Sequence, residues 1–240
     1  FEGPETVAAF IGEPVSVAHA LMIPPKEYWP MIREICSEHG VVLITDEVIT
    51  GFGRTGRLFG CEHWGLEPDM LLFAKGVTSG YMPLSGVLLI PEIPEAFRGG
   101  TKEAFMHGGT YSGHPAGCVA ALTNMDIIER EKLVERSARL GDYLLRRAEE
   151  LYRHPIVGHV CGLGLLVGLE LVVDRDKKTP VPVEVSRFVR RRTWELGLIY
   201  RYRNTGINLA PPLTVTEAQL ERALEILDQV LTETERKYLS

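Results

Sequence analysis

Two short apolar runs, each followed directly by a charged residue, constrain the fold of this chain most. Residues 41–45 lead into Asp46, and residues 70–74 lead into Lys75. Continuous apolar runs of this length are typical of strands buried in a parallel sheet. In open α/β sheets, ligands bind outside the carboxyl ends of the strands. We therefore expect Asp46 and Lys75 to face a binding site.

The other elements of the first half fit the same α/β pattern. Residues 7–11 predict another buried strand, and residues 84–90 predict a fourth, which could run antiparallel. Between them, apolar residues from Tyr28 to His39 recur at helical spacing, with Pro30 in the first turn and Gly40 as the stop. We expect a largely parallel sheet.

Helices dominate the second half, after Pro115. A first helix is predicted with Val119, Leu122 and Met125 on its apolar stripe, and a second follows a break at residues 129–132. We then expect a strand at 165–173, a helix around 185–196 and a strand near 198–200. The last helix is marked by a capping box, since Gln219 follows Thr216 at the required spacing. These patterns predict two domains, residues 1–128 and 129–240.

Composition excludes several classes of protein. The 26 basic and 32 acidic residues are interspersed, which does not favour a surface for nucleic acid or membrane, and no apolar run approaches the roughly 20 residues needed to span a bilayer. The four cysteines are widely spaced and form no CxxC pair, which favours a reducing compartment. We expect a cytoplasmic location.

Asp46 and Lys75 are open to more than one interpretation when each is taken alone. An acid after a strand is often a helix cap or a loop anchor, and a lysine can extend its charge to solvent or bind phosphate. A lysine with its stem packed among apolar neighbours instead has a lowered pKa, and its neutral amine can form a Schiff base. Because an acid and a lysine both follow such strands, we favour a role for them in a reaction over a purely structural one.

The motifs around these residues resemble those of class III pyridoxal-phosphate aminotransferases, in order and over the whole chain. They are Gly12-Glu13-Pro14-Val15, Asp46-Glu47-Val48, Gly51-Phe52-Gly53-Arg54-Thr55-Gly56, Trp64, Pro68-Asp69, Ala74-Lys75-Gly76, residues 107–115 (HGGTYSGHP) and Ala210-Pro211-Pro212-Leu213. The resemblance implies a fold type I pyridoxal-phosphate enzyme. Residues 1–128 would be part of its large cofactor-binding domain and residues 129–240 its small C-terminal domain.

The resemblance also implies roles for individual residues. Lys75 would hold pyridoxal 5'-phosphate as a Schiff base and then act as general base and acid. Asp46 would pair with the pyridine nitrogen, and Val48 would pack on one face of the ring. Thr110 would bind the cofactor phosphate of a neighbouring subunit, which implies a homodimer with shared sites. Glu13 matches a family acid near the cofactor, although a structural role is equally open.

Substrate choice follows from differences within the family. Arg201 matches the arginine that binds the substrate carboxylate in the branch that transfers amino groups from amines and ω-amino acids to pyruvate, and Arg203 competes for that role. Members that use 2-oxoglutarate carry Glu and Gln where this chain has Ala18 and Ile49. The resemblance therefore implies pyruvate as the acceptor, with 2-oxoglutarate as the alternative.

Other interpretations remain open. Family members have an N-terminal half that this chain lacks, so we expect a C-terminal portion whose activity requires that half, or else a non-catalytic fragment or pseudo-subunit. An ATP-dependent motor would need a phosphate-binding Gly-x-x-x-x-Gly-Lys-Ser/Thr loop, and the sequence has none. The seven histidines include no HExxH pair, so we expect no catalytic metal.

Overall fold

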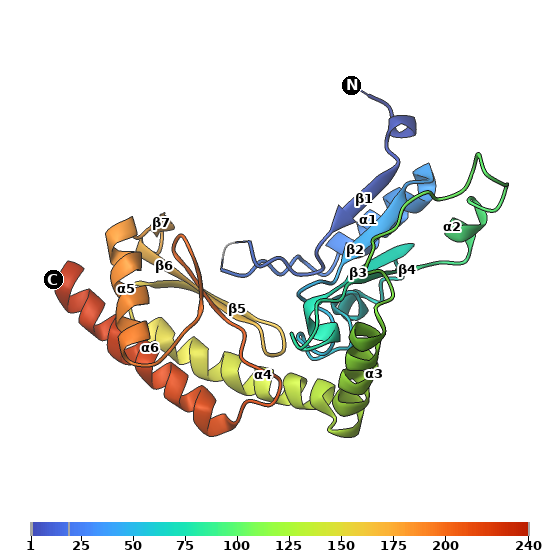
Figure 1. Ribbon diagram of the computed structural model, residues 1–240. Helices are drawn as coiled ribbons and strands as arrows, with labels where there is room; N and C mark the ends of the chain where they lie inside the picture. Colours follow the sequence, from blue (N-terminus) through green and yellow to red (C-terminus); the bar gives the residue numbers. More distant parts are fainter. Residues whose placement is uncertain (1, 19, 240) are drawn as a thin grey trace. The chain divides into compact units, whose positions relative to one another are not determined.

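Short strands and helices alternate along the chain in the computed structural model, which describes residues 2–18 and 20–239 (Figure 1). The helices are α1 (Tyr28–His39), α2 (Glu92–Glu95), α3 (Pro115–Arg130), α4 (Leu133–Glu149), α5 (Val183–Glu195) and α6 (Glu217–Tyr238), with 3-10 turns at Pro4–Thr6, Gly60–Trp64, Lys75–Val77 and Glu150–Arg153. Among the residues described, no helix is long and apolar enough to cross a membrane.

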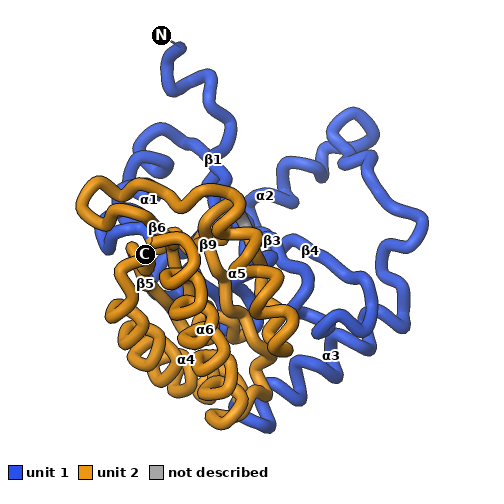
Figure 2. The backbone as a smooth tube through the Cα atoms, turned by 90° about the vertical axis from the view of Figure 1, so that its left-hand side faces the viewer, with its two compact units in different colours: residues 1–14, 24–52, 57–132 blue, residues 15–23, 53–56, 133–240 orange. Residues whose placement is uncertain are grey.

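The chain forms two compact units, coloured separately in Figure 2. The first contains residues 1–14, 24–52 and 57–132, and the second contains residues 15–23, 53–56 and 133–240. The assignment of residues 1–128 to a cofactor-binding domain and 129–240 to a small domain stays a prediction.

The first unit is built on a four-stranded sheet in the order β1 (Ala9–Gly12), β2 (Val42–Asp46), β3 (Met70–Phe73), β4 (Gly86–Leu89). β1, β2 and β3 are parallel, and β4 is antiparallel to β3. The predicted, largely parallel sheet is therefore confirmed, as is the antiparallel option for its last strand. Because Asp46 lies opposite Leu72, the carboxyl ends of β2 and β3 meet at one edge.

Helix α1 packs on one face of this sheet through Trp29 and Cys36, which are buried with Leu43 of β2 and Leu71 of β3. The Trp29 indole nitrogen also donates to the carbonyl of Pro14, at 3.1 Å. The predicted stop is confirmed, because Gly40 adopts a left-handed φ of 63° and its N–H caps the helix on the Cys36 carbonyl.

The prediction of burial fails for the outer strands. Ile11 of β1 is 57% exposed, and Val87 and Leu89 of β4 are 49% and 43% exposed. The physical reason is position: β1 and β4 are the two edges of the sheet, and these side chains point to the face opposite α1.

Helix α3 buries a different face from the predicted one. Val119, Leu122 and Met125 are exposed, whereas the buried residues of the helix include Gly117 and Ala121. Hydrophobicity therefore predicted the wrong stripe, because small residues allow closer packing of the helix backbone than branched ones do. The break that follows α3 is where it was predicted, with Lys132 at a left-handed φ of 51°.

The second unit is an antiparallel sheet covered by three helices. Its order is β5 (Val157–Gly162), β6 (Val167–Asp174), β9 (Gly206–Leu209), β8 (Arg201–Arg203), and β7 (Thr179–Pro180) pairs with β6. Helices α4, α5 and α6 share one hydrophobic core with β5, β6 and β9. β5 and β9 were not predicted, and the strand expected at 198–200 begins instead at Arg201.

The opposite face of this sheet is covered by residues 15–23, which come from far away in the sequence. A Cβ atom on Gly168 would lie 2.6 Å from the Leu21 Cβ, and one on Gly206 would lie 2.7 Å from the Ala20 nitrogen. Only glycine permits this approach, because real Cβ atoms do not come so close to their neighbours. The glycines of β6 and β9 thus leave room for residues 20 and 21 to pack directly on the sheet.

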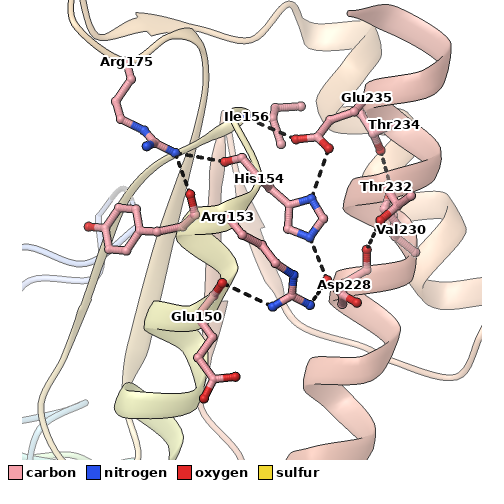
Figure 3. A network of polar contacts seen from close by, with 11 residues as sticks. Glu150, Arg153, His154, Ile156, Arg175, Asp228, Val230, Thr232, Thr234 and Glu235 are labelled. Carbon is pink, nitrogen blue, oxygen red and sulfur yellow. Dashed lines mark hydrogen bonds and ion pairs between the residues drawn. The ribbon is translucent and has the colours of Figure 1, made fainter. Parts of the chain in front are cut away.

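A buried histidine joins the end of the Glu150–Arg153 turn to α6 (Figure 3). His154 Nε2 lies 2.7 Å from Asp228 Oδ1, and His154 Nδ1 lies 3.1 Å from Glu235 Oε2. Arg153 also pairs with Asp228, and Arg175 donates to the His154 carbonyl at 2.9 Å. These contacts join the turn to α6 through side chains that already have partners, so the network has a structural role.

Candidate functional site

Three of the predicted site residues follow three neighbouring parallel strands of the first unit. Glu13 comes directly after β1, Asp46 is the last residue of β2, and Lys75 comes two residues after β3. The strands are parallel and aligned in register, so these residues lie along one edge of the sheet. This is the edge at which open α/β sheets bind ligands.

Asp46 is half-buried, and its Oδ1 accepts the backbone N–H of Val48 at 3.0 Å. Its side chain shares a face with Leu72 and Ile44, opposite α1. The strand ends at Asp46, and Val48 begins a turn. The same turn supplies the N–H that orients the carboxylate.

Sequence reasoning missed Glu47, the motif residue next to Asp46, which is fully buried and has clear partners. Its carboxylate accepts the backbone N–H groups of Gly60 and Cys61, each at 2.7 Å, and the hydroxyl of Thr50. Burial and the nearby Glu47 carboxylate raise the pKa of the Cys61 thiol. Strand alternation was the available signal, because it turns Glu47 to the face opposite Asp46.

Lys75 begins a 3-10 turn and has an exposed side chain. Apolar neighbours therefore do not bury the Lys75 side chain in this structure. Its backbone is left-handed, at φ 45°, which is uncommon for a residue with a Cβ. Gly76 allows the turn to lie close to the loop after Asp46, since a Cβ there would be 3.1 Å from the Phe52 Cβ.

The glycine-rich segment after Asp46 is divided between the two units. Arg54 belongs to the second unit, where its Nη1 donates to the carbonyls of Leu165 and Pro211, at 2.9 and 2.6 Å. Burial lowers the pKa of Arg54 to about 10, so the guanidinium stays charged at neutral pH. Two of the motifs, residues 51–56 and 210–213, thus meet through this arginine.

Thr110 lies in the loop between α2 and α3 and is exposed. It occupies a turn in which the Ser112 N–H donates to the Gly109 carbonyl at 3.0 Å, and the Gly109 N–H donates to Ser112 Oγ at 3.1 Å. Its hydroxyl is therefore presented on an exposed loop.

Arg201 belongs to the second unit, where it opens β8 opposite Asn208 of β9 and is exposed. The side chain of Arg203, its competitor, lies outside the described part of the structure. The candidate site in the first unit therefore consists of Glu13, Asp46 and Lys75.

These residues fit pyridoxal phosphate. An acid suits a protonated ring nitrogen, a lysine amine suits an aldehyde, and Asp46 and Lys75 supply both at one sheet edge. Within residues 2–18 and 20–239, no cluster of His, Cys, Asp and Glu could hold a metal ion.

Comparison with known proteins gives consistent matches. The sequence model of the family "Aminotransferase class-III" matches residues 2–231. The chain is 41% identical to a putrescine–pyruvate aminotransferase of Pseudomonas aeruginosa, over 97% of this chain and 51% of that protein. It is 42% identical to a diaminobutyrate–2-oxoglutarate transaminase of Halomonas elongata, over 98% of this chain and 50% of that protein.

The fold matches as well. A thermostable (S)-enantioselective omega-transaminase from Thermomicrobium roseum superposes with a TM-score of 0.92 at 44% identity, over 97% of this chain and 52% of that chain. The chain thus spans about half the length of the relatives it matches.

Proposed function

Because the chain belongs to the class III aminotransferases, which depend on pyridoxal phosphate, we propose that it carries out transamination. The amino group would move from an amine or ω-amino acid to a keto acid, with pyruvate as the acceptor. One observation carries this proposal: an acid and a lysine, Asp46 and Lys75, follow neighbouring parallel strands at one sheet edge.

When bound, pyridoxal phosphate supplies an aldehyde for the amino group and a ring that withdraws electrons from the reacting carbon. Asp46 would hold the ring nitrogen and would favour its protonated form by placing a negative charge beside it. The Val48 N–H orients that carboxylate at 3.0 Å, and the Val48 side chain would pack on the ring. Glu13 lines the same edge.

Lys75 has two tasks in this proposal. Its amine would hold the cofactor through the aldehyde until a substrate amine takes that place. The free Lys75 Nζ would then serve as the base that takes a proton from the substrate carbon and as the acid that gives it back. An exposed side chain on a short turn leaves Nζ free to move between these positions.

Arg201 would bind the carboxylate of the acceptor through its planar, two-pronged guanidinium. The relative from Pseudomonas aeruginosa is named for pyruvate, which supports pyruvate here. The relative from Halomonas elongata is named for 2-oxoglutarate, and this is the second candidate acceptor.

The proposed enzyme is a homodimer with shared sites, in which Thr110 binds the cofactor phosphate of the neighbouring subunit. Its exposed position on a loop supports a contact outside its own unit. A cytoplasmic location is supported by the four cysteines, all of which are free thiols in the structure.

The test is a panel of amine donors with pyruvate or 2-oxoglutarate as acceptor, measured on the intact protein and on two variants. We expect transfer to pyruvate that Lys75→Ala abolishes. We expect Arg201→Ala to raise KM for the keto acid, with a smaller change in kcat, because the arginine binds the acceptor in the ground state as well.

Three results would count against parts of this proposal. Efficient transfer to 2-oxoglutarate but not to pyruvate would replace the acceptor. An unchanged KM in Arg201→Ala would remove that residue's role. If pyridoxal phosphate forms a Schiff base with none of the lysines, the protein would be a non-catalytic fragment or pseudo-subunit.

A further inference from the structure

The segment after Lys75 has an unusual backbone that needs support. Lys75 and Ser79 are left-handed at φ 45° and 50°, although both carry a Cβ, and Gly80 follows at 81°. The turn itself is held by long backbone hydrogen bonds, among them Val77 N–H to the Ala74 carbonyl at 3.2 Å and Ser79 N–H to the Gly76 carbonyl at 3.3 Å. Left-handed residues of this kind persist only where surrounding structure holds them.

One side chain supplies that support from outside the segment. Asn124 Nδ2 donates to two successive carbonyls, Gly76 at 2.8 Å and Val77 at 3.1 Å. Its Oδ1 accepts the hydroxyl of Ser79 at 2.7 Å. Because the two carbonyls can only accept, they fix which way the amide is turned. Asn124 therefore connects the beginning and the end of the turn.

Helix α3 places Asn124 where it can make these contacts. The residue lies on the stripe that includes Gly117, Ala121 and Ile128, which are buried, and it is itself half-buried. An amide on the buried stripe of a helix is unfavourable unless its hydrogen bonds are made. Here all of them go to the segment that carries Lys75.

We infer that Asn124 is a positioning residue for Lys75, which it keeps aimed at the reacting carbon by fixing the turn from Gly76 to Ser79. The inference rests on the proposed function. In each turnover the lysine amine is released and must return, so the backbone that carries it has to stay in place while the side chain moves. Asn124 touches neither substrate nor cofactor in this role.

The test compares Asn124→Ala, Asn124→Asp and Ser79→Ala with the control Thr123→Ala, which changes an exposed residue on the same helix. Asn124→Asp keeps the shape but replaces the donating NH2 by an oxygen facing two carbonyls. We expect kcat per cofactor-loaded site to fall about 10- to 100-fold in both Asn124 variants, with KM for the amine within about threefold of wild type. Ser79→Ala keeps both carbonyl contacts, so we expect a smaller loss.

A second readout does not depend on activity. Amide hydrogen exchange of residues 76–81 should become faster in both Asn124 variants and stay unchanged in Thr123→Ala. Faster exchange with a wild-type kcat would overturn the positioning role, as would unchanged exchange. If Asn124→Ala fails to fold, Asn124→Asp and Ser79→Ala decide the question by the same criteria.

The outcomes separate this inference from the function on which it rests. An active wild type with unaffected Asn124 variants would overturn the inference alone. A wild type that binds no cofactor at Lys75 would overturn the proposed function and this role with it.

Discussion

Asp46 and Glu47 are adjacent carboxylates with different environments. Asp46 is half-buried on the open face of the sheet, whereas Glu47 is fully buried and accepts hydrogen bonds from Gly60, Cys61 and Thr50. Asp46 is the last residue of β2, and the next side chain, Glu47, is held instead by the backbone of Gly60 and Cys61. The Asp46 carboxylate is therefore available for chemistry, whereas the Glu47 carboxylate holds the loop after Phe59.

Substitution of the two acids by their amides should give opposite results. Glu47→Gln places an NH2 group against a backbone N–H, so we expect a loss of about 1–3 kcal/mol in the free energy of unfolding. Asp46→Asn should change stability by less than about 0.5 kcal/mol but greatly reduce transamination. Thermal unfolding and steady-state rates measure both. Equal stability of the two variants would contradict this assignment.

At the scale of the elements, a salt bridge joins α4 to α6 in the second unit. Arg147 contacts both oxygens of Glu221 at 2.9 Å, and the Tyr143 hydroxyl donates to Glu221 Oε1 at 2.5 Å. These hydrogen bonds, with Arg147 as the larger cause, lower the pKa of Glu221 from 4.5 to about 2. The charged carboxylate is thus the form that the folded state favours.

The pH dependence follows from the sign of that change. A carboxyl whose pKa is lowered on folding contributes stability above its unfolded pKa, and this contribution is lost as the pH falls toward the folded value. We expect the second unit to lose stability between pH 4.5 and about 2, and Glu221→Gln to make this loss shallower. Acid unfolding followed by circular dichroism measures it. Glu225→Gln, an exposed site on α6, is the control, and equal slopes for both variants would contradict the prediction.

Elements that are marked by residues close together in the sequence could be predicted. Elements that form only through contacts with distant parts of the chain could not. The capping box of α6 was found because Thr216 and Gln219 are three residues apart and each bonds to the other's backbone N–H. β9 was missed because it is short and contains the polar Asn208, which is buried only through its neighbouring strands. The stripe of α3 was wrong because packing, not hydrophobicity, decides which face is buried.

At the scale of the whole chain, the residues of the candidate site also differ in whether the sequence alone reveals them. Asp46 and Lys75 were found from the apolar runs before them and from the family's motifs. Asn124 was not, because it lies 49 residues after Lys75 and only the fold brings it to Gly76. Residues 15–23 likewise join the second unit through glycines at 168 and 206, which carry no local signal.

A shared dimer site makes a further prediction. Lys75→Ala and Thr110→Asp variants should each be inactive as homodimers, the second because a carboxylate repels phosphate. Mixed dimers should regain activity, because one of their two sites then combines an intact Lys75 with an intact Thr110 from the other subunit. Activity after subunit exchange, with size measured by light scattering, tests this. No recovery in mixed dimers of verified composition would contradict a shared site.

The central claim is that Lys75 is the residue that binds the cofactor. The most direct measurement is borohydride reduction of the intact protein with pyridoxal phosphate, followed by digestion and mass spectrometry. We expect the pyridoxyl phosphate adduct on the peptide that contains Lys75, and its loss in Lys75→Arg. An adduct confined to other lysines, or no adduct at all, would contradict the claim.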